Sequence, residues 1–95
     1  MNENRIDQIR RRLEAAFEPE TLEIYDESHL HIGHAGARDG KGHFRVRIIS
    51  RQFSGLPLRR RHQMVYEALD QLMETDIHAL SLVADSPDSV LIKPN

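Results

Sequence analysis

The sequence contains no cysteine and no tryptophan among its 95 residues. Without cysteine, the chain has no disulfide, no thiolate ligand for a metal and no thiol nucleophile. It also lacks a long apolar run, so we expect no membrane-spanning helix, and its polar opening segment predicts no secretory signal. These absences predict a cytoplasmic protein whose metal ligands, where it has any, are its six histidines rather than thiolates.

The sequence also lacks a strong excess of charge of one sign. The formal net charge is −2, with 13 Lys and Arg against 15 Asp and Glu. Proteins that mainly wrap nucleic acid usually have a basic domain, so this balance argues against that class. Two arginine triplets, at residues 10–12 and 59–61, are local exceptions. Arg59, Arg60 and Arg61 open a predicted helix, where guanidinium and free backbone N–H groups could meet DNA phosphate.

Hydrophobic periodicity predicts two long helices, over residues 4–17 and 58–73, and three strands, over residues 21–26, 43–50 and 77–83. The chain is too short for two independent cores, so we expect a single domain over residues 1–95. Its core would span about residues 4–84, and the tail, residues 85–95, could hold one short helix. The α-β-β-α-β order predicts an α+β fold with a three-stranded mixed sheet and both helices packed on one face.

Three histidines outside the predicted loop fall on predicted elements. The apolar stripe of the second helix comprises Leu58, His62, Val65, Leu69 and Leu72. We therefore expect His62 to pack against the sheet and to hydrogen-bond a backbone carbonyl. On the third strand, His78 shares one face with Leu80 and Leu82, whereas His43 faces outward from the second strand, either lining a partner surface or solvated.

The segment between the first two strands is a glycine-spaced loop that carries His29, His31 and His34. Imidazoles in such a loop indicate metal ligation, proton transfer or hydrogen bonding. Three nearby imidazoles could hold zinc or nickel, although the loop offers no carboxylate or thiol at the spacing of a closed zinc site. A plain polar loop that captures nickel incidentally is the simpler alternative. No phosphate loop, paired-carboxylate motif or nucleophile–base set is present, so we expect no enzyme and no small-molecule substrate.

Several segments together resemble the BolA family in order and spacing. They are Asp26-Glu27-Ser28, the His/Gly loop, His43-Phe44-Arg45-Val46, Phe53-Ser54-Gly55, the Arg61–Tyr66 run and Ile77-His78-Ala79-Leu80. The resemblance covers roughly residues 6–83. It implies a fold similar to class II KH domains. The Gly-x-x-Gly clamp of RNA-binding KH domains is incomplete here, because Leu58 stands in the place of the second glycine.

The resemblance also implies a partner and a shared cofactor. BolA proteins form heterodimers with monothiol glutaredoxins and share a 2Fe-2S cluster, to which the glutaredoxin side brings a cysteine thiolate and glutathione. Carried over by position, the ligands from this chain are His78 and His31, with His34 as the alternative loop ligand and His29 as a weaker choice. Histidine can replace thiolate on one iron of such a cluster. No cofactor is expected in the isolated chain.

Three functions follow from these observations. The first is an adaptor in iron–sulfur cluster trafficking or in iron and redox regulation. The second is a DNA-binding transcriptional regulator of morphology and stress genes that uses the helix starting near Arg59, since some bacterial BolA proteins are described in this way. The third is an interaction module in which the histidines are incidental.

Overall fold

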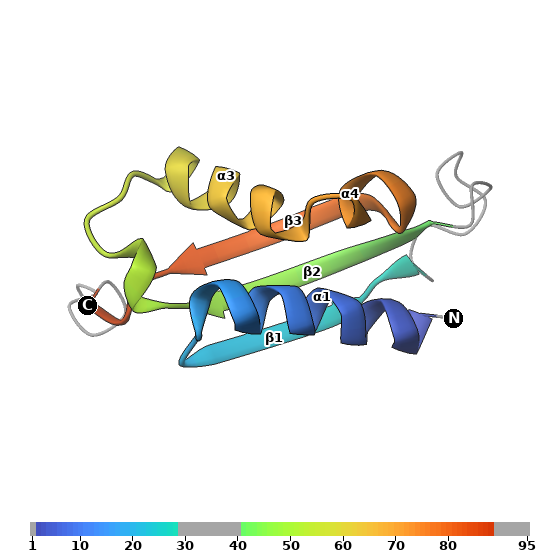
Figure 1. The fold of residues 1–95 in the computed structure, drawn as a ribbon, viewed down its shortest axis with the longest axis horizontal. Helices are drawn as coiled ribbons and strands as arrows, with labels where there is room; N and C mark the ends of the chain where they lie inside the picture. The colour runs from blue at the N-terminus through green and yellow to red at the C-terminus, as the bar shows by residue number, and fades with distance from the viewer. Residues whose placement is uncertain (1, 29–40, 89–95) are drawn as a thin grey trace.

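The structure is a computed structural model that describes residues 2–28 and 41–88. It follows the α+β order expected from the sequence, with helices on one side of a three-stranded sheet (Figure 1). The elements are α1 (Asn2–Phe17), β1 (Thr21–Asp26), β2 (Gly42–Ile49), the 3-10 helix η2 (Arg51–Phe53), α3 (Leu58–Leu69), α4 (Leu72–Thr75) and β3 (Ile77–Asp85). No helix within these described ranges is long and apolar enough to cross a membrane.

The three strands form one mixed sheet in the order β1-β2-β3. β1 and β2 are antiparallel, with Ile24 opposite Val46, and β2 and β3 are parallel, with Val46 opposite Leu82. Parallel neighbours need a crossover connection, and the segment containing α3 and α4 supplies it. Both expected pairings are confirmed.

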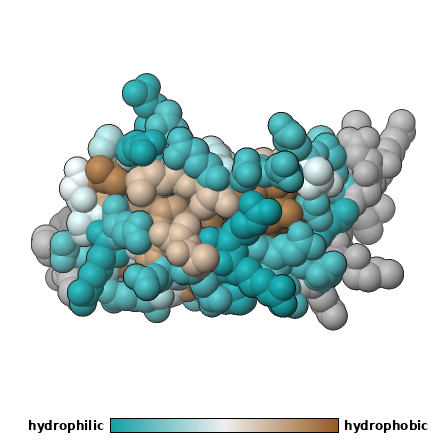
Figure 2. All heavy atoms as spheres, in the orientation of Figure 1, coloured by the Kyte–Doolittle hydropathy of each residue, from teal (hydrophilic) through white to brown (hydrophobic). Residues whose placement is uncertain are grey.

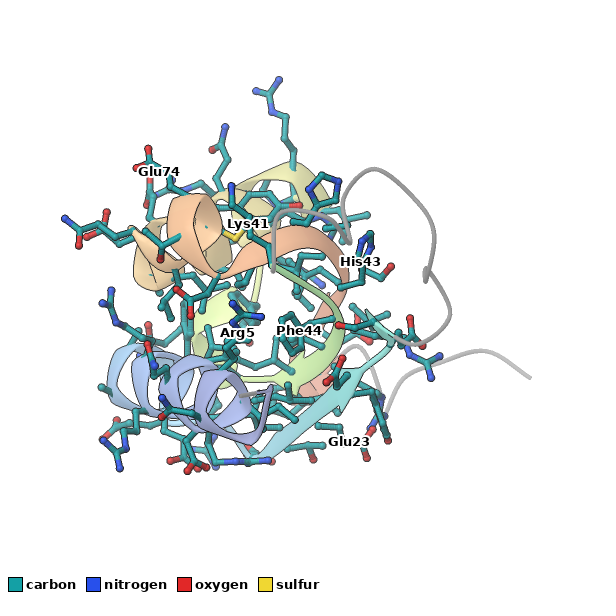
Figure 3. The ribbon with its side chains drawn as sticks, turned by 90° about the vertical axis from the view of Figure 1, so that its right-hand side faces the viewer. Arg5, Glu23, Lys41, His43, Phe44 and Glu74 are labelled. Atoms are coloured by element: carbon teal, nitrogen blue, oxygen red, sulfur yellow. The ribbon has the colours of Figure 1, made fainter. Side chains whose placement is uncertain are left out.

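The helices of the described part of the chain all pack on one face of the sheet. From α1 and α3, Ile9, Leu13, Val65 and Leu69 are fully buried in a single core. Burial of each such side chain contributes about 1.5–3 kcal/mol. Figure 3 shows Phe44 pointing toward this core and the adjacent His43 on the opposite side of β2. The outward side expected for His43 on the second strand is therefore confirmed.

Ser50 joins three elements at the far end of the sheet. Its hydroxyl donates a hydrogen bond of 2.8 Å to the carbonyl of Phe17, the last residue of α1. Its backbone N–H donates to the carbonyl of Asp85 at the end of β3, at 2.9 Å. The buried hydroxyl is therefore satisfied, and it fixes the end of α1 against the sheet.

The second helix, expected to run unbroken over residues 58–73, is interrupted, so that expectation is wrong. α3 ends at Leu69 because Asp70 has a φ of 51°, in the left-handed region, which stops the helical hydrogen-bond pattern. Leu58, expected on the buried stripe, is 58% exposed, because only the second half of α3 packs on the core. At the C-terminal end, residues 87–88 are helical, and the rest of the tail lies outside the described residues.

Candidate metal-binding site

β2 and β3 begin at the same end of the sheet, and each carries a histidine as its second residue. Gly42 lies opposite Ile77, but His43 lies opposite Ala79 rather than opposite His78. The parallel ladder therefore contains a bulge, in which His78 is the extra residue. A bulge re-aims the side chains around it, and such irregularities are common next to functional sites.

The two imidazole rings lie against each other. Their centroids are 5.0 Å apart and their planes are inclined at 48°. His43 is only 8% exposed, whereas His78 is exposed. Ile77 and Leu80 both join the core, so His78 lies with His43 on the helix-free face and not with Leu80. The face expected for His78 is therefore wrong, as is a solvated His43.

Hydrogen bonds tie the end of β1 to the start of β2 beside this pair. Asp26 Oδ1 accepts from the N–H of Ser28 at 2.9 Å, and Ser28 Oγ accepts from the N–H of His43 at 3.0 Å. The N–H of Glu27 donates to the carbonyl of His43 at 2.8 Å. The backbone of His43 is thus fixed at both its amide and its carbonyl. The sequence did not reveal this role, although Asp and Ser often bond nearby backbone groups in this way.

Gly42 allows the chain to pass close to a buried ring just before His43. A Cβ at this position would lie 2.5 Å from Cε2 of Phe44 and 3.1 Å from Oγ of Ser28. The first distance is shorter than any real carbon contact, and the ring of Phe44 is buried in the core. Glycine is needed here because of this close approach.

The charged side chains on the helix-free face are paired across β1 and β2. Arg45 Nε lies 3.1 Å from a carboxylate oxygen of Glu27, and its guanidinium carbon is 5.0 Å from the ring centroid of Tyr25. Arg47 pairs with Glu23 at 3.6 Å. These exposed pairs add little stability, but they neutralise the nearest cations on the strand that carries His43.

The loop histidines expected to act with His78 are His31 and His34, and both lie outside the described residues, as does His29. Their distance from His78 therefore stays a prediction. Within residues 2–28 and 41–88, no group of three or more His, Cys, Asp or Glu side chains could hold a metal ion. The described part of the chain thus brings two imidazoles together, those of His43 and His78. Further metal ligands would come from the residues outside this part or from a partner.

His62 does not fulfil its expected role in full. Its side chain is partly buried on α3, as expected. Its Nε2 atom, however, is buried and has no hydrogen-bond partner among the residues that the structure describes. The backbone carbonyl predicted as its acceptor is therefore not bonded to this nitrogen.

The three arginines proposed to contact DNA differ in their surroundings. Arg61 Nε donates to the carbonyl of Leu56 at 2.9 Å, and its Nη1 donates to the carbonyl of Ala84 at 3.1 Å. Its side chain is only 15% exposed. Arg59 and Arg60 are exposed, and Nη1 of Arg60 lies 3.8 Å from a carboxylate oxygen of Glu67 on the same helix.

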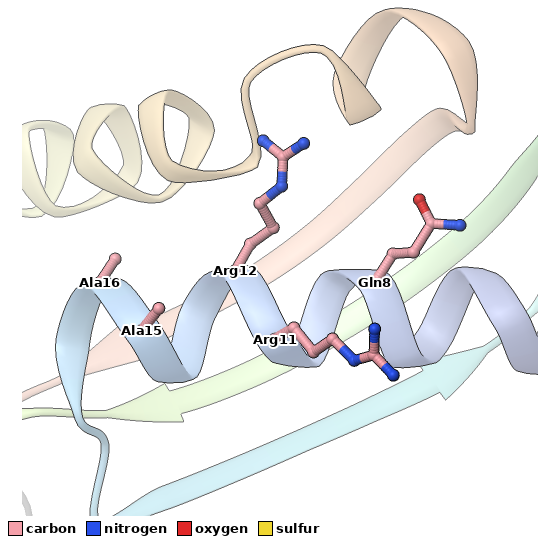
Figure 4. A pocket seen from close by; sticks show the side chains of 5 residues that line it. All are labelled: Gln8, Arg11, Arg12, Ala15 and Ala16. Carbon is pink, nitrogen blue, oxygen red and sulfur yellow. The ribbon is translucent and has the colours of Figure 1, made fainter.

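A separate hollow of about 500 Å³ lies on α1, away from the histidine pair (Figure 4). It is lined by Gln8, Arg11, Arg12, Ala15 and Ala16. The surface in this view is mostly polar around a central apolar area (Figure 2). Because α1 covers the opposite face of the sheet from His43, this hollow forms no part of the candidate metal site.

Comparison with known proteins bears directly on this arrangement. The family model for BolA-like proteins matches residues 13–89, which include both strands with the paired histidines. The chain belongs to the BolA family. This confirms the family expected from the sequence, whose members are non-enzymatic proteins.

Two relatives and one solved structure illustrate the similarity. "Protein BOLA1, chloroplastic" of Arabidopsis thaliana is 42% identical over 88 residues, which are 90% of this chain and 55% of the relative, so the chain spans about half of its length. "DNA-binding transcriptional regulator BolA" of Escherichia coli is 40% identical over 76 residues, 80% of this chain and 70% of the relative. The structure of BolA1 from Arabidopsis thaliana superposes with a TM-score of 0.74 at 35% identity, covering 86% of this chain and 90% of that one. The BolA fold is thereby confirmed.

Proposed function

We propose that this BolA protein binds a monothiol glutaredoxin and supplies histidine ligands to a 2Fe-2S cluster shared between the two proteins. The observation that carries the proposal is the place of His78: it is the extra residue of a β-bulge at the edge of the sheet, and it is exposed. An imidazole in that place is accessible to a partner docked against β3. The function is then cluster trafficking or iron and redox regulation.

The donor set of the chain fits such a shared cluster. Imidazole can replace thiolate on one iron of a 2Fe-2S centre and raises its reduction potential. The sequence has no cysteine, so this chain can supply only the imidazole half of the ligands. His78 is the proposed ligand from β3, and His31 is the proposed ligand from the loop, with His34 as the alternative.

The surrounding residues would hold the site rather than bind the cluster. The Ser28 hydroxyl and the Glu27 amide fix the backbone of His43, against whose ring His78 rests. His31 follows Ser28 by three residues in the sequence and lies outside the described part of the chain.

Anaerobic mixing with a cluster-loaded monothiol glutaredoxin tests the proposal. Visible absorption and circular dichroism should change, and a one-to-one complex should elute from a sizing column. The variant His78→Ala should lose the new spectrum, because its ligand atom is removed. The matched control is Ser81→Ala, an exposed position farther along β3, which should behave as the wild type.

The loop ligand can be assigned in the same experiment. His31→Ala should perturb the mixed spectrum more than His34→Ala does, and the reverse order would assign the ligand to His34. An unchanged spectrum and no complex with the wild-type chain would refute the proposed function.

DNA binding is the second candidate function, favoured by the name of the Escherichia coli relative and by two exposed arginines at the start of α3. Arg59 and Arg60 would contact phosphates, whereas Arg61 is engaged within the protein. Such binding should fall steeply with salt, because phosphate contacts release counterions. Absence of binding to duplex DNA at low salt would remove this candidate.

The cellular compartment stays a prediction. The name of the Arabidopsis relative places that protein in the chloroplast. The cytoplasmic location expected for this chain is tested by fractionating cells that express it at its natural level.

A further inference from the structure

We infer that His43 and His78 form a two-imidazole chelate that binds one late first-row divalent metal ion, such as Ni²⁺, in the isolated chain and without the loop histidines. The inference shares His78 with the proposed function, but it requires neither the glutaredoxin nor the cluster. His43 is the new ligand, since the pattern of the sequence assigned it to a partner surface or to solvent.

The spacing of the two rings fits a shared ion. Imidazole nitrogens bind zinc at about 2.0–2.1 Å, which places each ring centroid roughly 3.2 Å from the metal. Two rings that bind one ion at an angle between about 90°, as in tetragonal nickel sites, and the tetrahedral value then have centroids roughly 4.5–5.2 Å apart. The observed separation of the His43 and His78 centroids is 5.0 Å.

The backbone that carries the two rings is fixed before any metal arrives. His43 is held through its amide by Ser28 Oγ and through its carbonyl by the Glu27 amide. On β3, Ile77 is buried and Leu80 packs against the core. The backbone is therefore anchored in the core both before and after His78. A preorganised pair loses little conformational entropy when it binds, which favours chelation.

The charges near the pair also permit a cation. Arg45, two residues after His43, is paired with Glu27 and stacked on Tyr25. Imidazole ligands suit nickel, copper and zinc, and affinities for a given site rise from nickel to copper. His78 is the exposed member of the pair, so the ion would enter from its side, and water would complete the coordination shell.

Calorimetric titration of the tag-free full chain with NiCl₂ tests the chelate. We expect one Ni²⁺ per chain, and we expect His78→Gln and His43→Gln each to weaken binding about tenfold or more, because the second imidazole binds as a linked ligand. The double variant should lose the site altogether, because neither imidazole of the pair remains. A triple variant of the loop, with His29, His31 and His34 changed to Gln, should bind as tightly as the wild type.

The opposite pattern would overturn the inference. If the loop variant loses the site while His43→Gln keeps it, the nickel belongs to the loop. If neither set of substitutions changes the affinity, the pair is no ligand. Far-UV circular dichroism of each variant checks that it is folded.

Because His43 is buried, a measurement on the wild-type chain complements its variant. In the NMR spectrum of histidine-labelled protein, paramagnetic Ni²⁺ added below one equivalent should broaden two of the six ring signals first, those of His43 and His78. Initial broadening of the other histidines would refute the chelate. A chain that binds nickel through this pair but fails to change the glutaredoxin spectrum would refute only the proposed function, and the reverse result would refute only the chelate.

Discussion

Replacing Arg61 with methionine should destabilise the protein strongly, although the residue belongs to an arginine triplet at the start of a helix. The guanidinium donates to the carbonyls of Leu56 and Ala84 at 2.9 and 3.1 Å, and it lies 3.7 Å from a carboxylate oxygen of Asp85. Methionine keeps much of the apolar stem but leaves both carbonyls without this donor. Each net hydrogen bond from a charged group contributes about 1.5–3 kcal/mol, and two are lost here, so we expect a loss of about 3–6 kcal/mol.

Urea unfolding followed by circular dichroism measures this loss as a lower midpoint at an unchanged slope. The control is Arg59→Met, an exposed neighbour in the same triplet, which should change stability by no more than about 0.5 kcal/mol. If the two variants are equally stable, the contacts of Arg61 contribute little and the residue becomes available for DNA. A selective loss of stability in the Arg61 variant would instead restrict DNA contact to the exposed arginines.

Three further substitutions test the packing around the site and the core. Gly42→Ala should lower stability by about 1–3 kcal/mol in urea unfolding, because its Cβ would overlap the ring of Phe44, and an unaffected midpoint would contradict that close approach. Ser28→Ala should cost about 1 kcal/mol and speed hydrogen exchange of the His43 amide, whereas unchanged exchange would show that the hydroxyl does not hold it. Leu69→Ala should cost about 2–5 kcal/mol in the same assay, and a loss below 1 kcal/mol would place this side chain outside the core.

Much of the fold could be predicted because the spacing of apolar residues along the sequence indicates which face of each helix or strand is buried. In β2, every second residue from Phe44 to Ile48 is apolar in the sequence and buried in the structure. In α1, the buried residues Ile9 and Leu13 are four positions apart, which is the spacing of one helix face. The break after α3 could not be read in this way, because Leu72 and the residues before it fit one continuous stripe. The left-handed conformation of Asp70 depends on tertiary packing, which lets the short α4 bury Leu72 separately.

The candidate site was predictable only in part. The sequence identified His78 through the family motif but placed it on the wrong face, because strict alternation assumes an uninterrupted ladder. The bulge depends on how two strands distant in sequence align, and no local pattern encodes that alignment. For the same reason, the contact between His43 and His78 could not be foreseen, and it emerged only from the pairing of β2 with β3.

The bulge has a consequence for how such proteins can diverge. Because Ile77 and Leu80 anchor β3 on either side, the chain between them keeps its course whatever side chain stands at position 78. A substitution at this position would change the proposed donor atom from nitrogen to sulfur, or remove it, without moving the strand. Under the proposed function, metal ligation and folding therefore depend on neighbouring but separate positions of the chain.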